Sequence, residues 1–168
     1  MIVTSAERAR GLRQKPVYVL GWGEAICHGA VMNQMSDFTH TATSISGDRA
    51  YKMAGVKPDD VDVAQIYDSF TITVMLNLEG LGFCPRGESG HFVSGQRTAP
   101  GGDFPMNTDG GGLSSNHPGM RGIFSIIEAT RQLRGVCGER QVPNVKLALV
   151  HGTGGILSSE ATMILSNE

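Results

Sequence analysis

A glycine-rich stretch at residues 107–122, NTDGGGLSSNHPGMRG, constrains the fold of this chain more than any other segment. Its three consecutive glycines, residues 110–112, adopt backbone conformations closed to other residues and let a ligand approach the main chain without a Cβ in the way. An Asn-His-Pro-Gly turn follows, in which Pro118 suits a first helical position and Asn116 or His117 suits the cap before it. The stretch therefore predicts a ligand-facing loop that ends in a helix.

The helix expected after this turn runs from about residue 118 to residue 134, with Gly135 as its stop. Its apolar residues follow the spacing of one helix face: Met120, Ile123, Phe124 and Ile127, with Leu133 further along the same side. His117 would then lie at a helix N-terminus, beside free backbone N–H groups that favour a neutral imidazole. Such an imidazole suits a proton shuttle or a hydrogen bond to a carbonyl oxygen. The same placement also suits a capping histidine without chemistry.

Composition narrows the class of protein. The chain has 168 residues, 40% of them hydrophobic, which fits one globular domain with a real core. A net charge of −2 without basic clusters argues against nucleic-acid binding and polybasic membrane contact. No apolar run approaches the roughly 20 residues that span a bilayer, and the N-terminus lacks the apolar core of a secretory signal. Three widely spaced cysteines without a CxxC pair predict no disulfide framework, no metal site and a reducing, cytoplasmic location.

The order of predicted elements alternates strands and helices. The first half of the chain predicts a strand at residues 16–22, a long loop at residues 23–46, a helix at residues 48–54 that stops at Gly55, and a strand at residues 61–66. A helix follows from near Ser69, and a turn-rich excursion occupies residues 83–106. After the glycine stretch and its helix, strands are expected at residues 145–150 and 159–165. His28 and His40 in the long loop are interpreted as ordinary loop residues, and Cys27, Cys84 and Cys137 as incidental.

Two further candidates lie where predicted strands end. Tyr67 follows the strand at residues 61–66 and precedes a helix, which is where α/β proteins place ligands and catalytic groups. A half-buried tyrosine at a strand end explains the position equally well. His151 follows the buried strand at residues 145–150 and begins the sequence HGTGG. His117 and His151 each lie beside glycines at the tip of an element, and we expect them to converge on one site.

Three motifs in order resemble the C-terminal half of the thiolase fold. YDSF at residues 67–70 stands where thiolases carry Asn-Glu-Ala-Phe, SSNHPGMRG at residues 114–122 resembles their Gly-His-Pro-x-Gly motif, and HGTGG at residues 151–155 falls at their Cys-x-Gly-x-Gly motif. AGVKPDDVD at residues 54–62 is similar to a helix-turn-strand passage of the family. Among its branches, the chain looks closest to the lipid-transfer or sterol-carrier-type thiolase-like proteins.

The resemblance implies an α/β fold, one half of a layered α-β-α-β-α framework, with a mixed five-stranded sheet and helices on both faces. Residues 1–168 would form a single C-terminal-type domain, and residues 1–13 would be the tail of a missing N-terminal half. It also implies acyl-CoA chemistry in lipid metabolism, a Claisen condensation or its thiolytic reverse, with a coenzyme A thioester as substrate and no covalently bound cofactor.

Roles follow from the same resemblance. His117 takes the place of the histidine that activates the nucleophilic cysteine and lines an oxyanion hole, His151 replaces an acid/base cysteine, and Tyr67 replaces an asparagine that positions a water. A phenol at that place could donate a hydrogen bond or act as an acid/base. The residues expected to bind substrate or coenzyme A are Gly111, Gly112, Asn116, Gly154 and Gly155.

The family's nucleophilic cysteine lies in the N-terminal half, and none of the cysteines here is a good replacement. Three hypotheses result. The chain joins a separate N-terminal half for acyl transfer; or it performs retro-aldol cleavage of a β-hydroxyacyl-CoA with Tyr67 and His117; or it is a non-catalytic binding or assembly module. Uncovered apolar faces of a half fold predict association with that half or with itself. The resemblance adds a small OB-fold and zinc-ribbon protein as a further partner.

Overall fold

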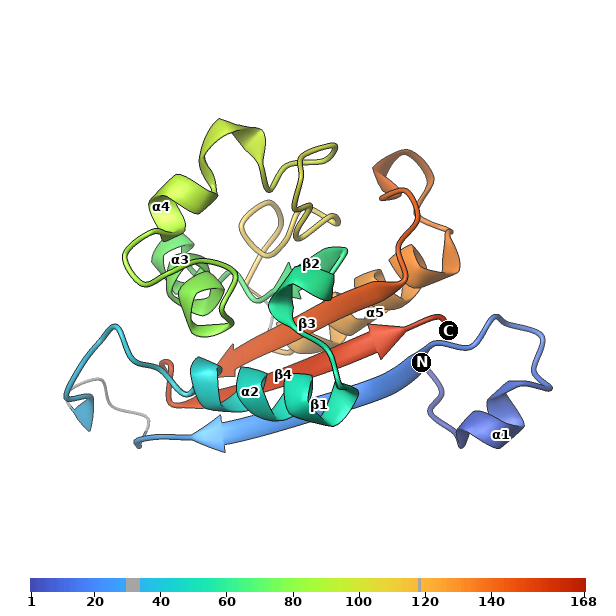
Figure 1. Ribbon diagram of the computed structural model, residues 1–168, viewed down its shortest axis with the longest axis horizontal. Helices are drawn as coiled ribbons and strands as arrows, with labels where there is room; N and C mark the ends of the chain where they lie inside the picture. The colour runs from blue at the N-terminus through green and yellow to red at the C-terminus, as the bar shows by residue number, and fades with distance from the viewer. Residues whose placement is uncertain (30–33, 118) are drawn as a thin grey trace.

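The computed structural model describes residues 1–29, 34–117 and 119–168. Figure 1 shows one mixed β-sheet with α2 in front of it and α5 behind it. The strands are β1 (Tyr18–Ile26), β2 (Val63–Ile66), β3 (Leu147–Gly154) and β4 (Ser159–Ser166), and the helices are α1 (Ala6–Ala9), α2 (Thr43–Ala54), α3 (Thr71–Gly80), α4 (Ser89–Phe92) and α5 (Arg121–Arg134). Short 3-10 helices at Pro58–Asp60, Ser94–Gln96 and Gly138–Arg140 complete the connections.

The sheet confirms the predicted α/β class. Its strand order is β1-β4-β3-β2. Strand β2 pairs with β3 in parallel, whereas β4 runs antiparallel to both β3 and β1. The carboxyl ends of β1, β2 and β3 therefore share one edge of the sheet. Four strands form where five were expected, because the fifth position, beyond β2, carries only an isolated parallel bridge between Ala64 and Met106.

Element boundaries differ from the sequence prediction mainly in the long loop expected at residues 23–46. Strand β1 continues to Ile26, and α2 begins at Thr43 rather than at residue 48. Part of that predicted loop, residues 30–33, lies outside the described residues. The stops at Gly55 and Gly135 are confirmed, since both glycines adopt left-handed φ values, 72° and 71°.

Small residues in β1 explain why the strand was underestimated. Gly21, Gly23 and Ala25 alternate along one side of β1 and are buried beneath α2. A Cβ at Gly23 would overlap the carbonyl oxygen of Ser46, and one at Gly21 would overlap that of Ala50. Helix α2 thus lies directly on the backbone of β1. The glycines that weaken a strand by propensity are here required by the helix above it.

The core is divided between the two faces of the sheet. On the α2 side the cluster includes Tyr51, Leu78, Leu149 and Ile164. On the α5 side a second cluster contains Val63, Ala129, Leu133, Val145, Ala148, Val150 and Leu165. A sheet covered on both faces needs apolar residues at successive positions, which is the pattern of the central strand β3.

Helix α5 is oriented differently from the sequence expectation. Its buried residues are mostly polar: Arg121, Ser125, Glu128 and Gln132, together with Ala129 and Leu133. Of the expected apolar side, Leu133 is buried, whereas Phe124 and Ile127 are 46% and 40% exposed. Hydrogen bonds inside the protein explain how this polar face is buried, because Arg121, Glu128 and Gln132 each have partners there. The apolar side of α5 is therefore free to meet another surface.

Glu128 is the centre of the polar contacts beneath α5. Its carboxylate accepts hydrogen bonds from Thr108 at 2.8 Å and from Arg140 through two nitrogens at 3.0 Å each. Burial alone would raise the pKa of Glu128, but the hydrogen bonds from Arg140, Thr108 and Gln132 outweigh it and lower that pKa. The charged carboxylate therefore connects α5 to Thr108, near the start of the glycine-rich stretch.

Replacing Gly23 by alanine is expected to destabilise the fold by roughly 3 kcal/mol, because the new Cβ forces α2 away from β1. Gly152→Ala is the matched control: Gly152 is also in a strand, but a Cβ there meets nothing within 4 Å. Urea unfolding of the two variants measures the difference. Equal midpoints for both variants would contradict the backbone contact between α2 and β1.

Candidate functional site

Tyr67 and His117 form a side-chain pair at the carboxyl end of β2. The phenol oxygen of Tyr67 lies 3.0 Å from Nδ1 of His117, and the two rings stack with their centroids 5.9 Å apart. The backbone N–H of Tyr67 donates to the carbonyl of His151 at 2.9 Å, which ties the tyrosine to the end of the sheet. The structure thus brings together two of the three predicted catalytic residues, which lie 50 positions apart in sequence.

Asp68, directly after Tyr67, holds the glycine loop. Its carboxylate accepts hydrogen bonds from the backbone N–H groups of Gly112 at 2.7 Å and Leu113 at 3.1 Å. Asp68 is buried, and a Cβ on Gly111 would overlap its Oδ2 atom. Gly111 also has a φ of 69°, in the left-handed region that favours glycine. The glycines are therefore needed for the approach of this carboxylate.

Two further contacts close the loop that carries His117. The buried guanidinium of Arg121, the first residue of α5, donates to both oxygens of Asp109 at 2.8 and 2.9 Å. The side-chain oxygen of Asn107 accepts a hydrogen bond from the backbone N–H of Ile66 at 2.8 Å, in the place where the carbonyl of a neighbouring strand would accept it. Sequence reasoning missed Asp68, Asp109 and Arg121. Their only signal was position: Asp68 follows Tyr67, and Asp109 precedes the three glycines.

His117 does not lie at the helix N-terminus, contrary to the sequence prediction. Helix α5 begins at Arg121 with Met120 as its cap, so His117 and Asn116 precede the helix by more than a full turn. Pro118, where the helix was expected to begin, lies outside the described residues. The free helical N–H groups are therefore not what surrounds His117. Its partner is the phenol of Tyr67.

His151 lies inside β3 rather than at a tip beyond it, and its side chain is fully buried. Nδ1 of His151 is 2.9 Å from the hydroxyl of Thr162, which is itself 2.9 Å from the hydroxyl of Ser46 in α2. Nε2 lies 2.9 Å from the buried carboxylate of Glu160, although the two groups are not aligned for a hydrogen bond. The structure brings the backbone of His151 to Tyr67 but places its imidazole beneath α2.

The remaining predicted residues divide between two loops. Gly111 and Gly112 lie in the loop held by Asp68, and the N–H of Gly111 donates to Asp109 at 2.9 Å. Asn116 is exposed beside His117. Gly154 ends β3, and Gly155 begins the turn to β4 with a φ of 56°. Contact of these five residues with coenzyme A stays a prediction.

The electrostatics of the pair favour a protonated phenol. Burial, aided by the negative charge of Asp68 and opposed by Arg121, raises the pKa of Tyr67 above its ordinary value of 10.0. A phenol that keeps its proton can donate a hydrogen bond, and an unprotonated ring nitrogen of His117 can accept it. The pair can pass a proton between phenol and imidazole and exchange it with a ligand at the exposed side.

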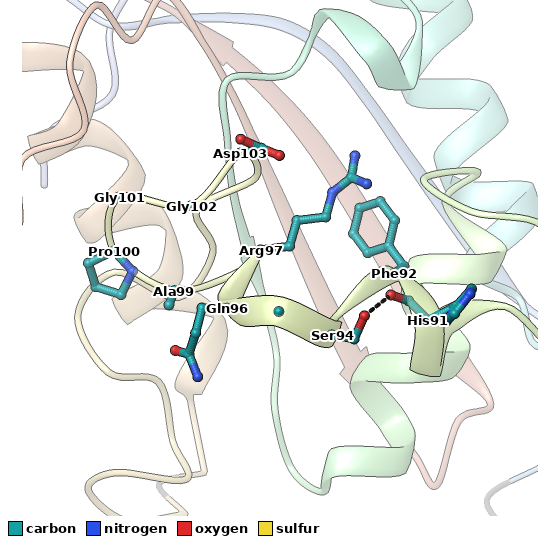
Figure 2. Close-up of a pocket in the computed structure, with 11 residues that line it drawn as sticks. His91, Phe92, Ser94, Gln96, Arg97, Ala99, Pro100, Gly101, Gly102 and Asp103 are labelled. Atoms are coloured by element: carbon teal, nitrogen blue, oxygen red, sulfur yellow. Dashed lines mark hydrogen bonds between the residues drawn. The ribbon is translucent and has the colours of Figure 1, made fainter.

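A hollow of about 640 Å³ lies outside this site, in the excursion after α4 (Figure 2). Arg97 projects over the ring of Phe92 there, 4.3 Å from its centroid, and Asp103 also lines the hollow. Tyr67, His117 and His151 do not line it, so we define the candidate site by the Tyr67–His117 pair. Among the described residues, no cluster of three or more His, Cys, Asp or Glu side chains is placed to hold a metal ion. Over the same residues, no helix has the length and apolar character to cross a membrane.

The fold is an α/β domain, and the candidate site lies at the carboxyl edge of its mixed sheet. Residues 23–167 match the family described as thiolase C-terminal domain-like, and the chain belongs to that family. The predicted resemblance to the thiolase family is confirmed, and proteins of the sterol-carrier type are among its relatives.

Relatives in this family have different names. An acetyl-CoA acetyltransferase of Methanothermobacter thermautotrophicus is 34% identical over 99% of this chain and 44% of its own length. Sterol carrier protein 2 of Rattus norvegicus is 34% identical over 91% of this chain and 29% of its own. The solved structure titled Ltp2-ChsH2(DUF35) aldolase superposes with a TM-score of 0.83 at 32% identity, over 96% of this chain and 42% of its own. The chain thus spans less than half the length of these relatives.

Replacing Asp68 by asparagine is expected to lower stability by about 1–3 kcal/mol and to disturb the Tyr67–His117 contact, because the amide replaces a charged acceptor of two N–H groups. Asp62→Asn is the control, since Asp62 also accepts two backbone N–H groups, each at 2.8 Å, from Lys146 and Leu147. NMR spectra of the His117 ring should change only in the Asp68 variant. Unchanged His117 signals in that variant would show that Asp68 does not position the pair.

Proposed function

We propose that the chain is the C-terminal half of a thiolase-like enzyme of acyl-CoA chemistry, and that Tyr67 and His117 perform its proton transfers. The observation that carries the proposal is the 3.0 Å contact between the Tyr67 phenol and Nδ1 of His117 at an exposed strand end. An acid and a base in direct contact can move one proton without water between them. Relatives named for acetyl-CoA and aldolase reactions support the substrate class.

Within this class, the pair suits retro-aldol cleavage of a β-hydroxyacyl-CoA. Tyr67 takes up the proton of the substrate's β-hydroxyl while its own proton passes to His117. The bond between the α- and β-carbons then breaks, and an aldehyde or ketone leaves. The remaining thioester enolate receives the proton at its α-carbon, which gives the shortened acyl-CoA. This reaction needs no covalent cysteine, and the relative named as an aldolase supports it.

Acyl transfer or thiolysis, the first hypothesis from the sequence, is the second candidate. It is supported by the relative named as an acetyl-CoA acetyltransferase. His117 would then activate a nucleophile from the N-terminal half. Gly111, Gly112, Asn116, Gly154 and Gly155 remain the proposed contacts for the coenzyme A thioester. We leave His151 out of the proton transfers in both candidates, because its imidazole is fully buried beneath α2.

The N-terminal half of the fold is the proposed partner of the α5 face. Val19 and Trp22 of β1 pair with Leu165 and Met163 of β4, so their side chains share the face on which α5 lies. Trp22 is 51% exposed there. These two residues and the exposed apolar side chains of α5 together are called the α5 face. Such a surface on a half-length chain supports association.

Two further proposals concern a second partner protein and the cellular location. A small partner protein of the OB-fold and zinc-ribbon type is supported by the similar structure Ltp2-ChsH2(DUF35) aldolase, whose name joins two proteins. A cytoplasmic location is supported by Cys27, Cys84 and Cys137, which are all free thiols.

Activity should depend on both members of the pair. In the assembled protein, Tyr67→Phe and His117→Ala are each expected to lower the rate of aldehyde or ketone release from a β-hydroxyacyl-CoA by about 100-fold or more. His40→Ala is the control, because His40 is an exposed histidine paired with Asp37 and does not contact Tyr67. Since the pKa of Tyr67 is raised, loss of rate by phenol ionisation should occur only above pH 10.

Other outcomes separate the candidates. Cleavage of acetoacetyl-CoA by added coenzyme A, with no release of aldehyde or ketone, would favour acyl transfer. Acyl-CoA binding by calorimetry without turnover of either substrate would favour the non-catalytic binding module. An unchanged rate in both the Tyr67 and the His117 variant would remove the pair from the mechanism.

The α5 face should decide assembly. Phe124→Asp is expected to weaken association with the N-terminal half by about tenfold or more, because it places a charge on an apolar interface. Ile45→Asp is the control, since Ile45 is an exposed apolar residue, 45% exposed, on the opposite helix α2. Native mass spectrometry of the tagged protein from its own cells measures the associated fraction. Equal association of both variants would place the interface elsewhere, and a homo-oligomer would support self-association.

A further inference from the structure

The hollow in Figure 2 lies in the excursion between α4 and the glycine-rich stretch and measures about 640 Å³. Its wall consists of most residues from 94 to 103, with His91 and Phe92 of α4 beside them. Neither Tyr67 nor His117 lines it. The hollow is therefore separate from the candidate site, and the proton transfers proposed for that site do not use it.

Backbone contacts hold the wall of the hollow in shape. The N–H of Phe104 donates to the carbonyl of Arg97 at 3.0 Å, and the N–H of Gly102 donates to the carbonyl of Ala99 at 2.9 Å. A Cβ at Gly102 would overlap the carbonyl oxygens of Gln96 and Arg97, so the two limbs of the loop lie directly against each other. A loop closed in this way presents a preformed hollow, which is usual for ligand sites.

Arg97 is held in the hollow by an aromatic side chain. Figure 2 shows it extending past the ring of Phe92, and its guanidinium carbon lies 4.3 Å from the ring centroid. The Phe92 ring meets the buried ring of Phe104 edge-on, with the centroids 5.5 Å apart. Stacking occupies only the face of a guanidinium and does not use the N–H groups in its plane. The cation is therefore fixed in position while its donors remain available.

The charge of Arg97 has no partner among residues 1–29, 34–117 and 119–168. Its guanidinium takes part in none of the ion pairs formed there, whereas that of Arg121 binds Asp109. The carboxylate of Asp103 lines the same hollow but does not pair with Arg97. Arginine has five N–H donors, no acceptor and a permanent positive charge. A fixed cation whose donors lack an acceptor favours an anionic ligand.

We propose that the hollow binds a phosphate group and that Arg97 contacts its oxygens. Two parallel N–H groups of a guanidinium match two phosphate oxygens, and one cation attracts a phosphate dianion about twice as strongly as a carboxylate. The exposed imidazole of His91 is a second donor at the same hollow. Asp103 opposes any anion there and therefore limits the affinity. The phosphate belongs either to coenzyme A or to free inorganic phosphate, and only the first of these sources rests on the proposed function.

The first experiment measures phosphate binding to the assembled protein by calorimetry at constant ionic strength. Inorganic phosphate is expected to bind, and Arg97→Gln to weaken that binding by about tenfold or more, because charge-assisted hydrogen bonds are lost. Asp103→Asn should strengthen the binding by about threefold, since a repulsion is removed. Arg49→Gln is the matched control, because the exposed Arg49 already donates to the carbonyl of Glu24 at 2.6 Å.

Three results would overturn the site: no phosphate binding, equal weakening by Arg97→Gln and Arg49→Gln, or acetate binding as tight as phosphate binding. Phe92→Leu tests the fixed position of the cation, because it keeps Arg97 and removes the ring. A loss of about threefold is expected, and unchanged binding would contradict the role of stacking. Equal urea midpoints for the Arg97 variant and the unsubstituted protein would show that lost binding is not lost folding.

The second experiment identifies the source of the phosphate. If it belongs to coenzyme A, coenzyme A should displace inorganic phosphate from the hollow, whereas pantetheine, which has no phosphate group, should not. If coenzyme A leaves the phosphate bound, the site belongs to free phosphate, and its recognition by Arg97 still holds. Phosphate binding involves no turnover, so its absence counts against the Arg97 hollow alone. A missing aldehyde or ketone product counts only against the function proposed for Tyr67 and His117.

Discussion

The carboxylate of Asp68 joins the end of β2 to the glycine loop, and the geometry of the candidate site depends on that contact. It accepts the N–H groups of Gly112 and Leu113 from a buried position. Because Tyr67 is the preceding residue, the same contact fixes the distance between the phenol and the loop that carries His117. The glycines have a steric role in this arrangement, since a Cβ on Gly111 would occupy the place of the carboxylate. A buried charge with two donors is costly to displace, which suits a contact that positions a reactive pair.

Sequence reasoning predicted the features that depend on local chemistry. Gly135 ends α5 because glycine adopts a left-handed φ without strain, and β3 is a continuous apolar run because helices cover the sheet on both faces. It failed where tertiary contacts decide. Spacing places Phe124, Ile127 and Leu133 on one side of α5, but of these only Leu133 is buried, and it lies beside the polar Ser125, Glu128 and Gln132. His151 was predicted at a tip, but pairing with β4 extends β3 past it and encloses its imidazole. No local pattern reveals such partners.

Two glycine-rich loops of the chain use glycine in the same way, to let a polar group approach the main chain closely. Gly111 makes room for the carboxylate of Asp68, and Gly102 makes room for the carbonyl oxygen of Arg97. The sequence predicts only a turn-rich excursion around the second loop. Neighbouring residues in sequence do not show that the guanidinium of Arg97 stacks on Phe92, because that contact depends on how the loop closes.

Helix α5 buries polar residues and leaves Phe124 and Ile127 partly exposed, so its rotation about its own axis must be fixed by something other than apolar burial. Turning the helix about its axis would bury Phe124 and Ile127 against the sheet, which hydrophobic burial alone would favour. The same rotation would separate Glu128 from Arg140 and Thr108 and would remove Gln132 from Thr108. A polar layer specifies a single rotation where an apolar one would accept several. The hydrogen bonds of α5 therefore keep its apolar residues exposed and hold them in the orientation in which they could contact another surface.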